Sequence, residues 1–113
     1  MVISTISIDT SKTALVVIDL QKGVVGRQTA PYAPADVVKN AAALAHACRK
    51  KFVPVFLVRV AFSPDGKDAL GPIVDAAPPR VPFPPDWSEI VQDMGPQQGD
   101  FVITKRQWGA LRD

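Results

Sequence analysis

The chain has 113 residues, of which 47% are hydrophobic and 21% charged, with a formal net charge of +2. These values are typical of one soluble globular domain rather than a disordered segment. The small, unclustered positive charge gives no electrostatic case for nucleic acid, and no apolar run approaches the ~20 residues that a membrane-spanning helix needs. The sole cysteine, Cys48, cannot form an internal disulfide, so we expect a reducing, cytoplasmic setting.

The first predicted element is a strand at residues 14–18, Ala-Leu-Val-Val-Ile. A continuous apolar, β-branched run of this length is typical of a strand that is buried on both faces. Asp19 follows directly at its carboxyl end. Residues 21–33 contain two glycines and Pro31, and this composition predicts a loop.

A helix is predicted to begin at Pro34, because proline favours the first turn of a helix. Apolar residues then recur at spacings of three and four, which indicates one buried helix face. The basic run 49–51 suits the carboxyl end of the helix, where cations are favourable, and we interpret it as solvated rather than as a binding patch. The predicted buried positions are Val37, Val38, Ala41, Leu44, Ala45 and Cys48.

Two further strands are predicted, at residues 54–60 and 101–104, and the second of them leads into Lys105. Most of the segment 62–100 is predicted to be loop, with one short helix near 87–94. Prolines concentrate between Pro72 and Pro85, which excludes a regular helix or a central strand there. An apolar, proline-rich stretch of this kind is more typical of an ordered surface loop than of a free linker.

The order strand, helix, strand within about fifty residues predicts a βαβ unit with parallel pairing. The fold class is therefore α/β, with a parallel sheet and flanking helices. Three strands are few for a sheet of this type, because its buried strands need neighbours and helices on both faces. We therefore expect the chain to correspond to the first part of a larger domain, truncated to about three strands.

Asp19 and Lys105 are the candidate site residues. Each follows a buried strand, and parallel strands present their carboxyl ends at one edge of the sheet, where ligands bind in open α/β sheets. Taken alone, Asp19 could cap a turn and Lys105 could be a solvated charge. The sequence Trp108-Gly-Ala after Lys105 is not a typical solvated surface pattern, and this favours a shared site.

Other chemical motifs are weak. Cys48 lies within the predicted helix on its apolar face, so we interpret it as a buried, unreactive cysteine. His46 has no partner at metal-ligand spacing, and no metal site is predicted. Gly23 and Gly26 do not form a dinucleotide fingerprint, nor is there a phosphate-binding P-loop, so no cofactor is expected.

Three blocks together resemble the isochorismatase-like cysteine hydrolase family: residues 14–23, residues 54–60 and residues 103–110, the last reading Ile-Thr-Lys-Arg-Gln-Trp-Gly-Ala. The resemblance implies a Rossmann-like parallel sheet. It also implies a cofactor-free Asp-Lys-Cys triad that hydrolyses C–N or ether-type bonds of small molecules. Asp19 matches the aspartate of that triad and Lys105 its lysine. The Asp-x-His motif of the nicotinamidase branch is absent, so neither that branch nor its metal is expected.

The nucleophilic cysteine of that family follows a fourth strand and a Gly-rich turn. We therefore expect it beyond residue 113 and expect residues 1–113 to be the amino-terminal portion of the domain, inactive alone. The expected partners are a small-molecule substrate and further copies of the chain. One alternative is a non-catalytic fragment that associates through an unpaired sheet edge. A phospho-acceptor receiver domain is disfavoured, because no acceptor aspartate lies in 53–60 and no second acid accompanies Asp19.

Overall fold

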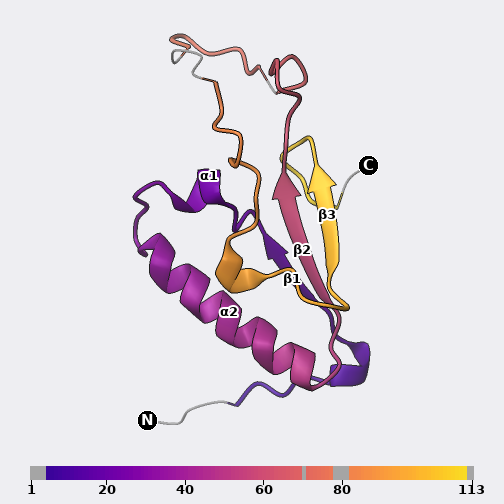
Figure 1. The fold of residues 1–113 in the computed structure, drawn as a ribbon. Coiled ribbons are helices and arrows are strands. Elements are labelled where there is room, and N and C mark those ends of the chain that lie inside the picture. The colour runs from indigo at the N-terminus through magenta and orange to yellow at the C-terminus, as the bar shows by residue number, and fades with distance from the viewer. Residues whose placement is uncertain (1–4, 70, 78–81, 112–113) are drawn as a thin grey trace.

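Three short parallel strands form the centre of the computed structural model, which describes residues 5–69, 71–77 and 82–111. The strands are β1 (Leu15–Ile18), β2 (Val55–Val60) and β3 (Phe101–Lys105). They lie in the order β1-β2-β3, with both pairs parallel (Figure 1). The predicted α/β fold with a parallel sheet is therefore confirmed, and each strand lies within two residues of its predicted bounds.

The long helix, α2 (Pro34–Lys50), has Pro34 in its first turn and basic residues in its last turn, as predicted. The short helix α1 (Lys22–Val25) was not predicted, because residues 21–33 were expected to be entirely loop. The backbone amides of Val24 and Val25 both donate to the carbonyl of Gln21, which starts this turn of helix. The described residues also form two short 3-10 helices, η1 (Thr10–Lys12) and η2 (Gln92–Met94).

Helix α2 runs along one side of the sheet and forms the core with it (Figure 1). The buried stripe of the helix is narrower than predicted. Ala45 is fully buried and Val38 nearly so, whereas Val37 and Leu44 are exposed. Cys48 is only half-buried, although it packs against the core cluster of Val17, Ala45, Val55, Leu57 and Met94. Since this sheet has only three strands, it covers a limited arc of the helix.

The described part of the connection from β2 to β3 contains turns and η2. Within the short helix predicted near 87–94, only residues 92–94 are helical, and they form the 3-10 helix η2. Part of the proline-rich stretch, residues 78–81, lies outside the described residues. The guanidinium of Arg49, at the end of α2, donates to the Asp100 carboxylate at 2.7 Å and to the Met94 carbonyl at 2.9 Å. These bonds attach the connection to the helix and fix the start of β3.

The other side of the sheet forms an open face. Residues paired in register on parallel strands point to the same side. In the described part of the chain, no helix packs on this side, and four of its apolar side chains remain 40–52% exposed. Phe56 and Phe101 stack there, with ring centroids 4.7 Å apart. The residues of the open face are Val16, Ile18, Phe56, Val58, Phe101 and Ile103.

Candidate active site

Asp19 and Lys105 meet at the carboxyl edge of the sheet. The Lys105 ammonium lies 3.3 Å from both carboxylate oxygens of Asp19, although 86 residues separate them in the sequence. The strands that carry them, β1 and β3, flank β2, and all three end on the same side (Figure 1). The prediction that the two charges come within pairing range at the same end of the sheet is confirmed.

The backbone of Asp19 has an unusual conformation. Its φ angle is +64°, in the left-handed region, which non-glycine residues rarely adopt and which aspartate tolerates better than most. The Asp19 amide still donates to the carbonyl of Val58, so the residue remains attached to β2 at the point where the chain turns. Backbone conformations of this kind persist where the surroundings enforce them, and they cluster at functional sites.

The Lys105 side chain is 6% exposed, whereas that of Asp19 is 35% exposed. Besides the ion pair, the ammonium donates to the carbonyl of Trp108 at 2.6 Å, so the turn after β3 folds back over its own lysine. A buried ammonium is costly unless it is paired and hydrogen-bonded, and both conditions are met here. The arrangement fixes one cation and leaves the Asp19 side chain partly exposed.

One carboxylate oxygen of Asp19 has unused hydrogen-bonding capacity. Its Oδ2 accepts a hydrogen bond from Lys105, but its Oδ1 is buried and receives no hydrogen bond from any residue that the structure describes. Lys105 contacts that oxygen as a charge without the alignment of a hydrogen bond. A buried acceptor without a donor is unusual and can receive a proton or a ligand.

Gln21 is a site residue to which the sequence analysis gave no role. It is fully buried, and its side-chain amide exchanges two hydrogen bonds of 2.8 Å with the backbone N–H and C=O of Val60. The same amide nitrogen donates to the carbonyl of Trp87 at 3.3 Å. Gln21 thus continues the sheet hydrogen bonding past the end of β1. The signal was available, since a polar residue stands just after a buried strand.

The cysteine lies elsewhere. Cys48 is near the carboxyl end of α2, and its carbonyl accepts a hydrogen bond from the amide of Val53, just before β2 begins. That position is at the amino end of the strands, opposite the edge that carries Asp19. Within the described residues, no group of three or more His, Cys, Asp or Glu side chains could hold a metal ion.

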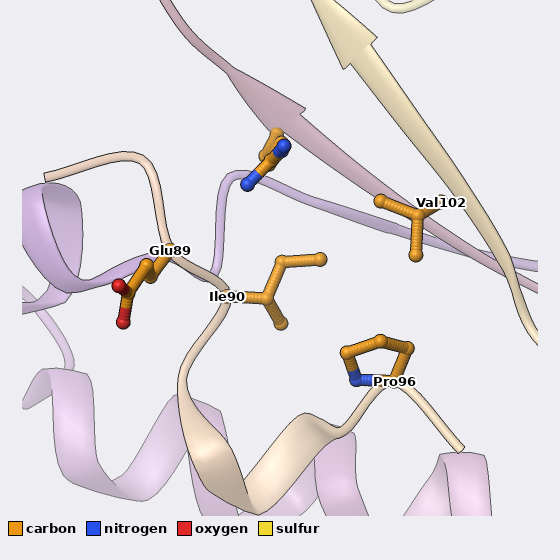
Figure 2. Close-up of a pocket in the computed structure, with 5 residues that line it drawn as sticks. Glu89, Ile90, Pro96 and Val102 are labelled. Carbon is orange, nitrogen blue, oxygen red and sulfur yellow. The ribbon is translucent and has the colours of Figure 1, made fainter. Parts of the chain in front are cut away.

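A separate pocket lies over β2 and β3 and has a volume of about 350 Å³. Figure 2 shows Ile90, Pro96 and Val102 directed toward one another, with Glu89 beside them. Arg59 completes the lining, and its guanidinium donates to the hydroxyl of Thr104. Neither Asp19 nor Lys105 lines this pocket, so we do not assign the candidate site to it.

The comparisons with known proteins agree with this geometry. Residues 13–113 match the model of the isochorismatase domain. That match covers most of the sequence. The chain belongs to the isochorismatase family. No described helix of this family member is long and apolar enough to cross a membrane.

Individual relatives support the same family. The chain is 46% identical over 110 residues to the isochorismatase family protein YwoC of Bacillus subtilis, and 41% identical over 106 residues to YecD of Escherichia coli O157:H7. These matches include 96% and 94% of this chain but 56% of each relative. The chain therefore spans about half the length of the curated isochorismatase family proteins that it matches.

Solved structures support the same family assignment and fold. An isochorismatase family protein from Burkholderia thailandensis is 43% identical, with a TM-score of 0.76 over 87% of this chain and 52% of that one. A cysteine hydrolase from Pseudomonas syringae is 28% identical, with a TM-score of 0.55 over 87% of this chain and 48% of that one. The Rossmann-like parallel sheet expected for an isochorismatase family member is thus supported by neighbours of the same fold.

Proposed function

We propose that Asp19 and Lys105 belong to the Asp-Lys-Cys triad of a cofactor-free hydrolase that cleaves C–N or ether-type bonds of a small molecule. The observation that carries the proposal is the unused Oδ1 acceptor of Asp19, held 3.3 Å from a buried ammonium. An acceptor of this kind can take the proton of an attacking thiol, which is one general way of activating a nucleophile. We also propose a reducing, cytoplasmic setting, in keeping with the single cysteine of this 113-residue chain.

The proposed chemistry divides between the two residues. The Asp19 carboxylate accepts the thiol proton while the thiolate attacks the substrate carbon, and it returns the proton to the leaving group as the bond to that group breaks. Water then hydrolyses the bond between the substrate carbon and the cysteine sulfur, which releases the product and restores the thiol. The Lys105 ammonium orients the carboxylate and stabilises negative charge that develops beside it. Cys48 is not the proposed thiol, because it lies at the opposite end of the strands. The thiol would therefore belong to a part of the domain for which this sequence has no counterpart.

The test compares the 113-residue chain with a fusion that continues it with the matching remainder of YwoC. Both are assayed on a panel of small amides and isochorismate-like ethers. We expect turnover by the fusion and none by the 113-residue chain. In the fusion, Asp19→Asn should lower kcat by about 10²–10⁴-fold, the usual contribution of general acid–base catalysis. Cys48→Ser is the matched control and should keep full activity. Equal turnover by the two forms would refute a thiol outside this chain.

A second candidate function is non-catalytic association. The open face of the sheet favours it, because Val16, Ile18, Phe101 and Ile103 are 40–52% exposed on one surface. Both outer strands, β1 and β3, also have an edge without a neighbour in the described part of the chain. Apolar faces and unpaired edges promote pairing with another chain. Homo-oligomer formation is the simplest such association.

A further inference from the structure

Arg59 is a charged residue near the end of β2, the central strand of the sheet. Central strands of parallel sheets are normally apolar along their whole length. Side chains alternate along β2, so Arg59 lies on the same side as Val55 and Leu57, which belong to the core formed with α2. A half-buried guanidinium on this side of a central strand is unusual, and its surroundings indicate what it could bind.

The guanidinium of Arg59 is held in place but only partly used. Its Nε donates at 3.0 Å to the hydroxyl of Thr104, the residue that pairs with it on β3. Among the residues that the structure describes, no carboxylate forms an ion pair with Arg59 and no acceptor receives a hydrogen bond from its two Nη atoms. The Nη edge of a guanidinium matches the two oxygens of a carboxylate.

The nearby acid does not neutralise this arginine. Glu89 lines the same pocket as Arg59, but its carboxylate lies 2.7 Å from the ammonium of Lys22. A carboxylate that is already paired with one cation contributes little net field at a second. Arg59 therefore gives the pocket a positive charge that no described residue balances.

The walls of the pocket are apolar. Ile90, Pro96 and Val102 point toward one another in Figure 2, and Val102 remains 44% exposed. The volume of about 350 Å³ is near the lower end of the range for small-molecule sites. These walls suit a short hydrocarbon body, whereas a compact inorganic anion would leave them uncovered.

We propose that this pocket binds a small aliphatic carboxylate. The two Nη atoms of Arg59 donate to the carboxylate oxygens, and the three apolar side chains contact the hydrocarbon chain. The site is separate from the proposed triad, because Thr104 and Lys105 are adjacent in β3 and their side chains point to opposite sides of the sheet. The inference therefore does not depend on the proposed hydrolase activity.

The test measures binding of three probes to the 113-residue chain by NMR titration: hexanoate, hexanamide and inorganic phosphate. We expect hexanoate to bind in the millimolar range and to shift the signals of the Arg59 Nε–H group and the Val102 methyl groups. Hexanamide lacks the charge and phosphate lacks the hydrocarbon chain, so each should bind at least about fivefold more weakly.

Substitutions then assign the contacts. Arg59→Gln removes the charge and should weaken hexanoate binding at least about tenfold, whereas Arg59→Lys keeps the charge without the planar fork and should have an intermediate effect. Val102→Thr replaces one wall methyl group by a hydroxyl and should weaken binding about threefold. The matched control is Arg27→Gln, which makes the same change at an exposed arginine outside the pocket and should leave binding unchanged.

Three results would overturn the inference: no hexanoate binding up to about 50 mM, equal binding of hexanoate and hexanamide, or equal weakening by Arg59→Gln and Arg27→Gln. Shifts confined to Lys105 and Trp108 would also overturn it, because the carboxylate would then bind at the candidate active site. The comparison of the three probes uses the unsubstituted chain, so it tests the proposal even if a substitution prevents folding.

Discussion

At the scale of single residues, the candidate site depends on a carboxylate in a left-handed backbone conformation and an ammonium that is almost completely buried. Asp19 has φ = +64°, and Lys105 retains only 6% exposure of its side chain. Breaking a buried pair by removing one partner leaves an uncompensated charge, which costs more than removing both. The pair therefore couples stability to the geometry that the proposed chemistry needs.

The first prediction is a double-mutant cycle on this pair. Asp19→Asn keeps a side chain that tolerates the left-handed conformation but removes the counter-ion, so it should destabilise the chain by about 1–3 kcal/mol. This range is lower than for a fully buried pair, because Asp19 is 35% exposed. Adding Lys105→Met should recover much of the loss. Urea unfolding measures Asp19→Asn, Lys105→Met and the double variant, and strict additivity would mean that the two residues do not interact.

The side chain of Gln21 pairs with the backbone at the end of β2, as a neighbouring strand would. Its side chain satisfies both backbone groups of Val60 and reaches the carbonyl of Trp87. The second prediction is that Gln21→Leu, which is similar in size, destabilises the chain by about 2–4 kcal/mol, because it leaves buried polar groups unpaired. Gln28→Leu, at an exposed position, is the control and should change stability by less than about 0.5 kcal/mol. Similar effects of the two substitutions in urea unfolding would contradict this role.

At the scale of elements, the sheet is held to α2 by packing and by one ion pair at the end of the helix. Arg49 binds the Asp100 carboxylate, whose side chain is 3% exposed, and the backbone amide of Gln97 donates to the same group. Burial alone would raise the pKa of Asp100. The hydrogen bonds from Arg49 and Gln97 and the arginine charge outweigh burial, and the pKa lies below its ordinary value.

The third prediction concerns acid. Since the pKa of Asp100 is lower in the folded chain than in the unfolded chain, ionised Asp100 stabilises the fold above the unfolded value of about 4. That stabilisation is lost as the pH falls below about 4 toward the folded pKa. Urea unfolding at pH 6 and pH 3 should therefore show a smaller acid loss for Asp100→Asn than for the parent chain. Asp75→Asn, at an exposed position, should retain the parent profile.

At the scale of the whole molecule, the sheet has helix on one side and the open face on the other. Parallel sheets are normally covered on both faces, because their strands are apolar throughout. The chain also covers 56% of the length of each of the two curated relatives described above. An apolar surface of this kind should determine the behaviour of the 113-residue chain in solution.

The fourth prediction is that this chain self-associates through the open face. Replacing Ile18 and Ile103 together by threonine keeps β-branched side chains and removes much of the apolar surface. This double variant should raise the dissociation constant at least about tenfold in sedimentation equilibrium. Phe52→Asn is the control, because it removes an apolar side chain that is more exposed and lies away from the open face. Asparagine is chosen because it tolerates the positive φ of +59° at this residue. An equal weakening by the control would point to non-specific aggregation.

Local pattern determined much of this protein. The apolar runs predicted all three strands, and Pro34 with the basic run 49–51 predicted the bounds of α2. Asp19 and Lys105 were placed together from the sequence, because parallel strands must end at one edge. The family blocks predicted the isochorismatase domain. These are consequences of hydrophobic periodicity and chain direction, which a sequence carries directly.

Tertiary structure alone decided what those elements touch. A three-strand sheet covers a limited arc of α2. Leu44 is therefore exposed and Ala45 buried, although they follow Ala41 by three and four residues and both fit the predicted apolar face. The side chain of Gln21 bonds to the backbone of Val60, the last residue of β2, and the local sequence pattern does not specify this partner 39 residues away. The ring contacts of Phe62 with Phe83 and Trp87 likewise bring together residues that are far apart in the sequence. Contacts between distant segments depend on packing of the whole chain, and this is why the sequence predicted the elements and the charged pair but not their surroundings.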